Sequence, residues 1–327
     1  MPFGAFATFM FILGVLAYLN PNIGKSGGLL RTDITVDYIA TYLVYLVTGL
    51  TLPVQDLSKA YHHWDTLLFT QCFAFIMFQG IMAVCTFVLQ FYPVHPSLLE
   101  GFEILSTLPP SVSTATMLTK LVGGNTVTSS MNSVFGCLLG ILLTPIFIAL
   151  VNDSHDVDVP NTKVCLHLFL TAALPLLLGQ FIQYKHRKIP YGSTVANFGQ
   201  VQVLFAFYAR ACNALTKDHT FEEVDKFSLI ITIVMLVILH ITIALILLLS
   251  SYYVFHYSSK DAVAIMFVAS RKSITLGLPI IVNIFEDCDE VGCLSLPLIV
   301  YSVTQILIGG LSVHLVKWWM KKHRRRR

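Results

Sequence analysis

Ten apolar segments follow one another along the chain, and they restrict what it can fold into more than any other feature. They cover about residues 3–19, 34–52, 65–91, 98–121, 126–151, 163–184, 191–212, 226–252, 260–285 and 291–316. A membrane-spanning helix needs about 20 predominantly apolar residues. Ten such helices with short loops would use nearly all of the 327 residues. The pattern predicts an all-α polytopic membrane protein without a separate soluble domain.

The balance of residue types excludes several classes of protein. Hydrophobic residues make up 55% of the chain and charged residues only 12%, whereas a typical soluble domain carries about 25% charged residues. An ordinary cytosolic enzyme, a disordered protein and a nucleic-acid-binding domain are therefore excluded, because so few charges cannot cover a soluble surface of this size. The sequence contains no G-x-S-x-G, H-E-x-x-H or zinc-ligand spacing. We predict neither an enzyme nor a bound cofactor or firm metal site.

Lysine and arginine residues in the connections, counted together with those at the ends of the apolar segments, predict the orientation. The even-numbered connections and both termini hold 13 of them, and the odd-numbered connections hold 5. The positive-inside rule then places both termini in the cytoplasm. The basic run Lys321–Arg327 would contact anionic lipid headgroups of the cytoplasmic leaflet, or serve as a trafficking signal. Cys288 and Cys293 share a loop on the opposite side and could pair in an oxidising compartment.

Five segments on each side of a connecting loop suggest an internal repeat. An odd number of spans per half inverts the second half relative to the first, and inverted repeats are a common plan of transporters. We therefore predict a first five-helix repeat at 1–151, a connecting loop at 152–162, a second five-helix repeat at 163–316 and a basic cytoplasmic tail at 317–327.

The fourth segment of each half is the most polar and the most interrupted. In the first half, Pro109 and Pro110 cannot both continue a helix, because proline lacks an N–H and crowds the preceding turn. In the second half, a polar run precedes Gly277 and Pro279. The hydroxyl and charged residues at these breaks are Ser111, Ser113, Thr114, Thr116, Ser270, Arg271, Lys272 and Ser273. Two broken membrane segments at equivalent positions predict a transport site, and helix packing alone is the alternative.

Arg271 and Lys272 are the charges that the membrane should exclude. A charge near the bilayer centre costs about 2.5–3.5 kcal/mol on the insertion scale, so such residues usually serve a pathway or pair internally. Glu103 on the fourth segment is the preferred acidic partner, and Asp37 is the second. The alternative is that Lys272 extends to the membrane interface. Lys120, near the end of the fourth segment, is predicted to be an interface residue.

Four stretches carry a resemblance to a known family: LNPNIGKSGGLLRTDITVDY, LPPSVSTATMLTKLVGGNTVTSSMNSVFGCLLG, DAVAIMFVASRKSITLGLPI and LSLPLIVYSVTQILIG. Over essentially its whole length the chain resembles the member 7 branch of solute carrier family 10, in the bile acid:sodium symporter superfamily, which is related to fungal regulators of calcium uptake. The resemblance implies a ten-helix fold with a core and a panel domain, in which discontinuous helices 4 and 9 cross. It also implies a location in the plasma membrane or in the Golgi and endoplasmic reticulum. The function that it implies is linked to calcium entry and does not include bile-acid transport.

The resemblance carries the sodium sites over only in part. The bile-acid members use a Ser-Asn pair in segment four, where this chain has Ala115-Thr116, and their hydroxyl positions in segment five match Ser129 and Ser133. Their segment nine has a glutamate and, four positions later, a glutamine, which here are Val268 and Lys272. A lysine ammonium can take the place of a bound cation, since both satisfy the same oxygens. The resemblance therefore implies a degenerate sodium site.

Two hypotheses about function follow. In the first, the protein is a secondary transporter whose cavity lies between the crossed segments, with Arg271 and Lys272 favouring an anionic or organic small solute. Neutral ligands would come from Ser111, Ser113, Thr114, Thr116, Ser129 and Ser133. In the second, which rests on the resemblance, the protein is a negative regulator of the calcium-entry machinery and moves no substrate itself.

Overall fold

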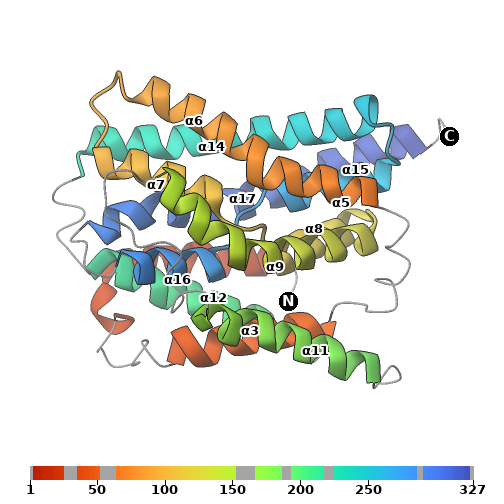
Figure 1. Cartoon of the computed structure of the whole chain (residues 1–327), viewed down its shortest axis with the longest axis horizontal. Coiled ribbons are helices and arrows are strands. Elements are labelled where there is room, and N and C mark those ends of the chain that lie inside the picture. The colour runs from red at the N-terminus through yellow and green to blue at the C-terminus, as the bar shows by residue number, and fades with distance from the viewer. Residues whose placement is uncertain are drawn as a thin grey trace.

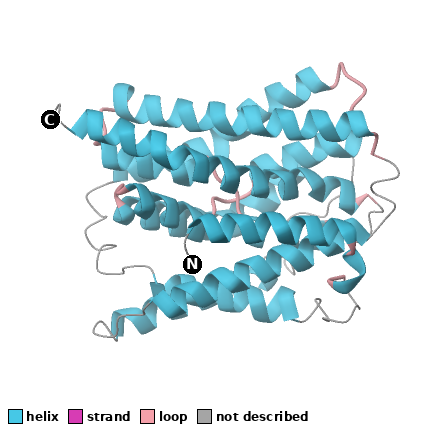
Figure 2. Cartoon of the chain, turned by 180° about the vertical axis from the view of Figure 1, so that it is seen from behind, coloured by secondary structure: helices cyan, strands magenta, loops and turns pink. Residues whose placement is uncertain are grey.

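The structure is a computed structural model that describes residues 3–25, 35–51, 64–151, 166–185, 193–216, 224–285 and 290–324. Within these ranges every regular element is a helix (Figures 1 and 2). The prediction of an all-α protein is confirmed. The connecting loop at 152–162, Cys288 and the last three residues of the tail lie outside the described residues.

Helix is found in each of the ten predicted apolar segments. The first half of the chain forms α1 (Phe3–Leu19), η1 (Pro21–Ile23), η2 (Thr35–Ala40), α3 (Thr41–Thr51), α5 (Trp64–Cys72), η4 (Phe73–Met77), α6 (Phe78–Leu89), α7 (Pro96–Thr107), α8 (Val112–Val122) and α9 (Thr126–Val151). The second half forms η5 (Phe169–Ala173), α11 (Leu174–Lys185), α12 (Ser193–Thr216), α14 (Lys226–Leu249), η6 (Ser250–Val254), α15 (Ser259–Ala269), α16 (Ile274–Ile284) and α17 (Val291–Arg324). The π-helical elements η2, η4, η5 and η6 adjoin α-helices directly, so that α5, η4 and α6 make one continuous helix.

The last helix is longer than its apolar segment. Helix α17 was predicted to end near 316 and continues to Arg324, so part of the predicted basic tail is helical. Cationic side chains near a helix C-terminus interact favourably with its dipole, which explains why the helix does not end where the apolar residues do.

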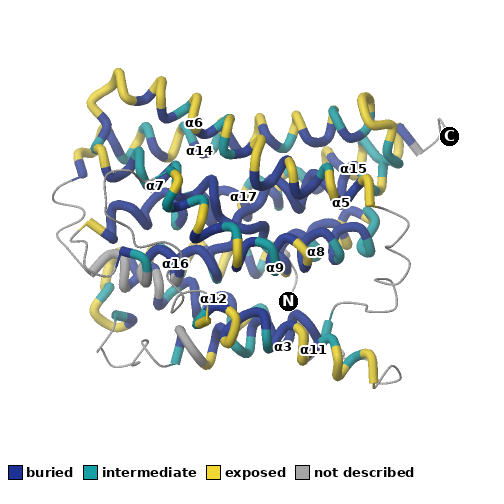
Figure 3. The backbone as a smooth tube through the Cα atoms, viewed as in Figure 1, coloured by how far each residue is buried: buried dark blue, intermediate teal, exposed yellow. Residues whose placement is uncertain are grey.

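The described helices have the lengths and surfaces of membrane helices. Five of them are long and apolar enough to cross a bilayer: Trp64–Leu89, Thr126–Val151, Leu166–Lys185, Lys226–Val254 and Val291–His323. In α14, Ile230, Val234 and Ile238 recur one turn apart and are each at least half exposed. Figure 3 shows exposed residues along the outer sides of α6 and α14. A long apolar stripe of this kind is stable against lipid and unfavourable against water.

The helices divide into two groups. Helices α1, α3, α11 and α12 pack on one another, and we call them the outer layer; α5 to α9 and α14 to α17 form the inner bundle. In Figure 1, α3 and α11 lie at the bottom of the view. These two helices approach closely because a Cβ on Gly49 would collide with the Leu176 carbonyl, and one on Gly179 would collide with the Leu46 carbonyl. Small residues allow such close approach of membrane helices.

Two helices of the inner bundle are interrupted where the sequence predicted breaks. The first break separates α7 from α8 and contains Pro109 and Pro110. These prolines pack against Gly140 and Gly136 of α9, respectively, where any Cβ would collide with the rings. The second break, at 270–273, separates α15 from α16. Figure 2 shows unwound chain in the middle of the bundle. The fold therefore places backbone groups that lack helical hydrogen-bond partners deep inside the protein.

Candidate functional site

The two breaks contact each other. The backbone N–H of Ser273 donates a hydrogen bond of 2.8 Å to the carbonyl oxygen of Pro109. Two helix C-terminal ends, those of α7 and α15, and two helix N-terminal ends, those of α8 and α16, therefore meet in one region. The C-terminal ends carry partial negative charge and the N-terminal ends partial positive charge, so the region can hold ions of either sign.

The ammonium of Lys272, a residue of the second break, lies at the C-terminal end of α7. Its Nζ donates hydrogen bonds to the carbonyl oxygens of Ala74 at 2.8 Å, Ser106 at 2.7 Å and Leu108 at 2.9 Å. It also lies 4.2 Å from the ring centroid of Phe78. The side chain is 0% exposed, so the alternative in which Lys272 extends to the interface is wrong. All three ammonium hydrogens have carbonyl acceptors, which is the full complement that an ammonium can use.

The unwound segment of the second break is held by neighbouring helices. Gln305 of α17 pairs twice with the backbone of Lys272: its Oε1 accepts from the N–H at 3.0 Å, and its Nε2 donates to the carbonyl at 3.0 Å. The Tyr301 hydroxyl donates to the Ser270 carbonyl at 2.6 Å and lies 3.1 Å from Nδ1 of His240. Backbone groups that the break leaves without helical partners are thus satisfied by side chains.

Arg271 lies at the C-terminal end of α15 and is 1% exposed. Its Nε and both Nη atoms have no hydrogen-bond partner among the described residues. The guanidinium lies 5.5 Å from the Phe267 ring centroid, and it lies so close to Gly309 of α17 that a Cβ there would collide with it. The face of the Phe267 ring and the negative end of the α15 dipole stabilise the positive charge of Arg271.

Glu103, the preferred acidic partner, contacts another residue. The Glu103 carboxylate accepts a hydrogen bond of 3.1 Å from Thr86 Oγ1, whereas the Lys272 ammonium donates its three hydrogen bonds to backbone carbonyls. In the described part of the chain the pairing of Glu103 with Lys272 is therefore not formed, because the carbonyls at the end of α7 take its place. The side chain of Asp37 lies outside the described residues.

Neutral oxygens gather between α5 and α9. Ser129 Oγ accepts from Thr119 Oγ1 at 3.2 Å, and Gln71 Nε2 donates to the Asn132 carbonyl at 2.8 Å. Gln71 Oε1, Asn132 Oδ1 and Ser133 Oγ are buried and have no hydrogen-bond partner among the described residues. No group of three or more histidine, cysteine or carboxylate side chains forms a metal-ligand cluster in the residues described. These oxygens are uncharged, so they would hold a cation weakly.

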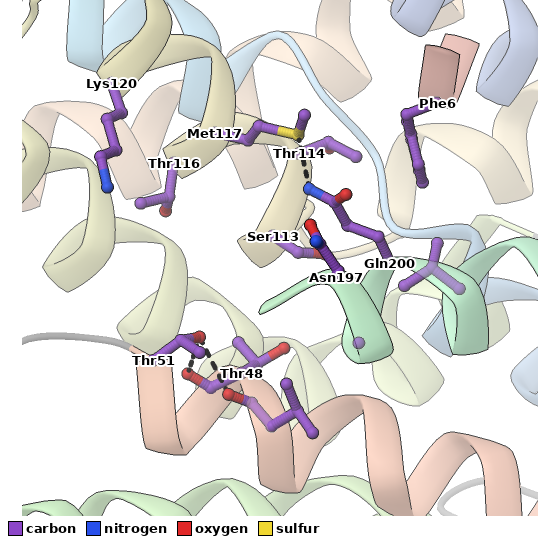
Figure 4. Close-up of a pocket in the computed structure, with 13 residues that line it drawn as sticks. Phe6, Thr48, Thr51, Ser113, Thr114, Thr116, Met117, Lys120, Asn197 and Gln200 are labelled. Carbon is purple, nitrogen blue, oxygen red and sulfur yellow. Dashed lines mark hydrogen bonds between the residues drawn. The ribbon is translucent and has the colours of Figure 1, made fainter. Parts of the chain in front are cut away.

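A cavity of about 380 Å³ separates the inner bundle from the outer layer along α8 (Figure 4). It is lined by Ser113, Thr114, Thr116, Met117 and Lys120 of α8, Val47, Thr48 and Thr51 of α3, Asn197, Gly199, Gln200 and Val203 of α12, and Phe6 of α1. Its size is within the range of small-molecule sites, which are usually about 300–1,000 Å³.

The cavity separates the predicted site residues into two sets. Three predicted hydroxyl residues line it, and Ser111 contacts one of them through a hydrogen bond of 2.7 Å to Thr114. The other predicted residues are buried in the inner bundle and do not line the cavity: Ser129, Ser133, Ser270, Arg271, Lys272 and Ser273. The two buried cations therefore do not touch a solute in this cavity.

Lys120 was predicted to be an interface residue, and it is exposed in the last turn of α8. That it also lines the cavity was not predicted. Sequence reasoning also missed the contributions of α3 and α12. A signal for Lys120 was present: Ser113, Thr116, Met117 and Lys120 recur at helical spacing and share one face of α8. No such signal exists for α3 and α12, because only the tertiary fold brings them to α8.

Comparisons with known proteins find similarity to membrane transporters over nearly the whole chain. Residues 4–318 match the SBF-like CPA transporter family. Sodium/bile acid cotransporter 7-B of Xenopus laevis is 32% identical over 96% of this chain and 93% of its own length. Sodium/bile acid cotransporter 7 of Danio rerio is 33% identical over 95% of this chain and 94% of its own. A probable chloroplastic sodium/metabolite cotransporter of Oryza sativa subsp. indica is 22% identical over 94% of this chain and 73% of its own.

Proposed function

The chain belongs to the SBF-like CPA transporter family, and on that premise we propose that it is a ten-helix solute carrier built from two inverted repeats. Its solute would bind in the cavity along α8, and Lys272 would occupy a cation position permanently, so that transport would not depend on sodium. The observation that carries the proposal is the set of three carbonyl oxygens around the Lys272 ammonium.

Polar contacts at the ends of the broken helices support the inverted repeat. At the start of α7, Ser97 Oγ donates to Glu290, next to the start of α17. At the start of α15, Asp261 Oδ1 accepts from Asn125 Nδ2 at 2.7 Å and from Thr128 Oγ1 at 2.8 Å, at the start of α9. Each broken helix is therefore linked at its beginning to the last helix of the other half, which is the exchange that an inverted repeat predicts.

The carbonyl partners of Lys272 support the tethered cation. A sodium ion in a protein is held by oxygen ligands that replace its water shell, and backbone carbonyls are the usual ones in ion-selective sites. Here the same kind of oxygen receives hydrogen bonds from an ammonium on a side chain that cannot leave. The relatives named as sodium cotransporters make sodium the natural alternative, so the ion must be tested directly.

The orientation predicted by the positive-inside rule assigns a side to the cavity. In that orientation α3 and α8 both end at the cytoplasm, and the cavity residues Thr51 and Lys120 lie in the last turns of these helices. A solute would then enter from the cytoplasmic side, and the outer layer would have to move relative to the inner bundle to release it on the other side.

Sodium binding to the purified protein tests this proposal. We expect no saturable binding of radioactive sodium to the wild type, and binding to appear in the Val268→Glu/Lys272→Gln variant, which restores the polar residues of the related symporters. Lys226→Gln, an exposed lysine at the start of α14, is the matched control. Saturable sodium binding to the wild type, at a stoichiometry near one, would refute the tethered cation.

A link to calcium homeostasis, in the plasma membrane or in the Golgi and endoplasmic reticulum, is the part of the proposal that rests on the resemblance. We propose that restraint of calcium entry depends on the solute cavity. Cells that lack the protein would be complemented with wild type, Lys272→Ala or Ser113→Trp, which blocks the cavity, and cytosolic calcium would be imaged after store depletion. Full control of calcium entry by both variants would favour the second candidate, a regulator that transports nothing.

A further inference from the structure

The cavity along α8 presents a particular hydrogen-bonding pattern, and this pattern restricts the class of solute. The inference rests on the proposed function, because it takes the cavity to be the solute site. Three threonines on α3 and α8 and the charged side chain of Lys120 make up this pattern.

The hydroxyl hydrogens of three of the four cavity threonines are donated to the helix backbone. Thr48 Oγ1 donates to the Val44 carbonyl at 2.7 Å, Thr51 Oγ1 donates to the Val47 carbonyl at 2.9 Å, and Thr116 Oγ1 donates to the Val112 carbonyl at 3.0 Å. A hydroxyl has one hydrogen and two lone pairs. With its hydrogen held by the helix backbone, each of these threonines offers a solute only an acceptor oxygen.

Lys120 supplies the opposite property. Among the described residues that line the cavity it is the one with a charge, and an ammonium offers three donors and no acceptor. Figure 4 shows its side chain beside Thr116, with Thr48 and Thr51 on the facing helix. Lys120 and these three threonines therefore favour a solute that presents negative charge to the ammonium and hydrogen-bond donors to the threonine oxygens.

A third contact extends the pattern. Gln200 Nε2 donates to the sulfur of Met117 at 3.4 Å, and a thioether is a weak acceptor. A solute oxygen would be a stronger acceptor for this amide. A group that both donates to threonine oxygens and accepts from an amide is a hydroxyl.

We infer that the cavity binds a compact polyhydroxylated anion, with its acidic group at Lys120 and its hydroxyls donating to Thr48, Thr51 and Thr116. The shared chemistry covers sugar carboxylates and sugar phosphates. The hydroxyls of a bile acid are held far apart on a rigid apolar steroid, so they cannot all reach these acceptor oxygens while its acidic group lies at Lys120. This disfavours a bile acid, because unpaired buried polar groups are costly.

Ligand-induced stabilisation of the purified, full-length chain tests the class. The probes are glucuronate and glucose 6-phosphate, which combine charge and hydroxyls in a compact molecule, together with glucose, which has only hydroxyls. Hexanoate has charge and no hydroxyl, and taurocholate has its charge and its hydroxyls spread over a large rigid steroid. We expect one or both of the first pair to raise the unfolding temperature in a saturable way, and the others to bind at least tenfold more weakly. A response to glucuronate alone or glucose 6-phosphate alone identifies the carboxylate or the phosphate as the acidic group.

Variants locate the effect. Lys120→Gln should weaken binding of the active probe by tenfold or more, and Thr51→Val or Thr116→Val should weaken it by about three- to tenfold, as expected for loss of one hydrogen bond. Thr232→Val is the matched control, because Thr232 makes the same kind of bond, to the Ser228 carbonyl at 2.8 Å, but on α14 and away from the cavity. Equal binding by the threonine variants and wild type, or tighter binding of hexanoate or taurocholate, would overturn the inferred class.

A separate labelling experiment distinguishes failure of the class from failure of the cavity. Ser113 lines the cavity and is exposed in it, so Ser113→Cys should react with a membrane-impermeant maleimide, with the wild type as background. Protection of this cysteine by a solute outside the inferred class would retain the cavity as the site and overturn the class. Binding of glucuronate or glucose 6-phosphate without any protection would place the ligand elsewhere and overturn both.

Discussion

The substitution Lys272→Met tests the tethered cation through stability, without knowledge of the solute. Methionine keeps a long unbranched side chain and removes the ammonium. It leaves the carbonyl oxygens of Ala74, Ser106 and Leu108 without the donor that each of them has in the wild type.

The magnitude follows from these three bonds. A buried acceptor that loses its partner costs about 1–3 kcal/mol, so the Ser106 and Leu108 carbonyls at the end of α7 cost about 2–6 kcal/mol together, and the Ala74 carbonyl, which lies inside a continuous helix, adds less. Removal of the charge offsets part of this loss, because the burial of an ammonium itself costs several kcal/mol. We therefore expect a net loss near the lower end, about 3 kcal/mol in the free energy of unfolding. At about 2 °C per kcal/mol for a large domain, this corresponds to a decrease in Tm of about 6 °C.

The assay is thermal unfolding in detergent, with sodium chloride and choline chloride compared at equal ionic strength. Wild type should have the same Tm in both salts. Lys272→Met should be about 6 °C less stable in choline and should recover part of that loss in sodium, because vacated carbonyls can coordinate an alkali ion. Lys226→Met, at an exposed position, should change little in either salt. Two results would refute the reasoning: a variant as stable as wild type in choline, or a wild type that sodium stabilises as much as it stabilises the variant.

Three further predictions concern packing and the links between the repeats. Gly309→Val should lose about 1–3 kcal/mol of stability by overpacking against the Arg271 guanidinium, and addition of Arg271→Met should recover most of that loss in a thermal unfolding double-mutant cycle. Asp261→Ala should leave Asn125 Nδ2 and Thr128 Oγ1 without their acceptor, and hydrogen exchange at the start of α9 should become at least tenfold faster while exchange in α14 stays unchanged. Gly49→Leu should abolish or strongly reduce the yield of folded protein in size-exclusion chromatography, because any Cβ there collides with α11 backbone, whereas Gly80→Leu, with no atom within 4 Å of the added Cβ, should behave as wild type.

The helical plan of the protein was predictable because it depends on local properties of the chain. Apolar segments of membrane length located every helical region, and two adjacent prolines located the first break. The second break was also predicted, from the polar run that includes Arg271 and Lys272. The end of α17 was not predicted. A helix that leaves the apolar region can continue because its residues have high helix propensity and its basic side chains interact favourably with the helix dipole.

The contacts of the site were less predictable, and the reason is physical. Glu103 was the expected carboxylate partner of Lys272, but backbone carbonyls stabilise the ammonium instead. Residues of any type can supply a backbone carbonyl. Lys120 was assigned to the interface because it lies near the end of an apolar segment, although helical spacing places it on the face of α8 that carries Ser113. Neither carbonyl ligands nor tertiary partners can be recognised from residue types, so they are found only once the three-dimensional structure is known.

The position of the two buried cations has a consequence for the energetics of transport. Lys272 lies at the C-terminal end of α7 and Arg271 at the C-terminal end of α15, so both broken helices end against a positive charge that is part of the chain. A symporter gains its driving force by binding an ion on one side of the membrane and releasing it on the other. A cation that is covalently attached is never released, and it therefore contributes no free energy from an ion gradient. A carrier of this design would equilibrate its solute across the membrane, and the direction of net transport would be set by the solute's own electrochemical gradient, which for an anion includes the membrane potential. In proteoliposomes, sodium gradients of either direction should then leave both the initial rate and the final level of solute uptake unchanged, and accumulation above equilibrium on an inward sodium gradient would contradict this argument.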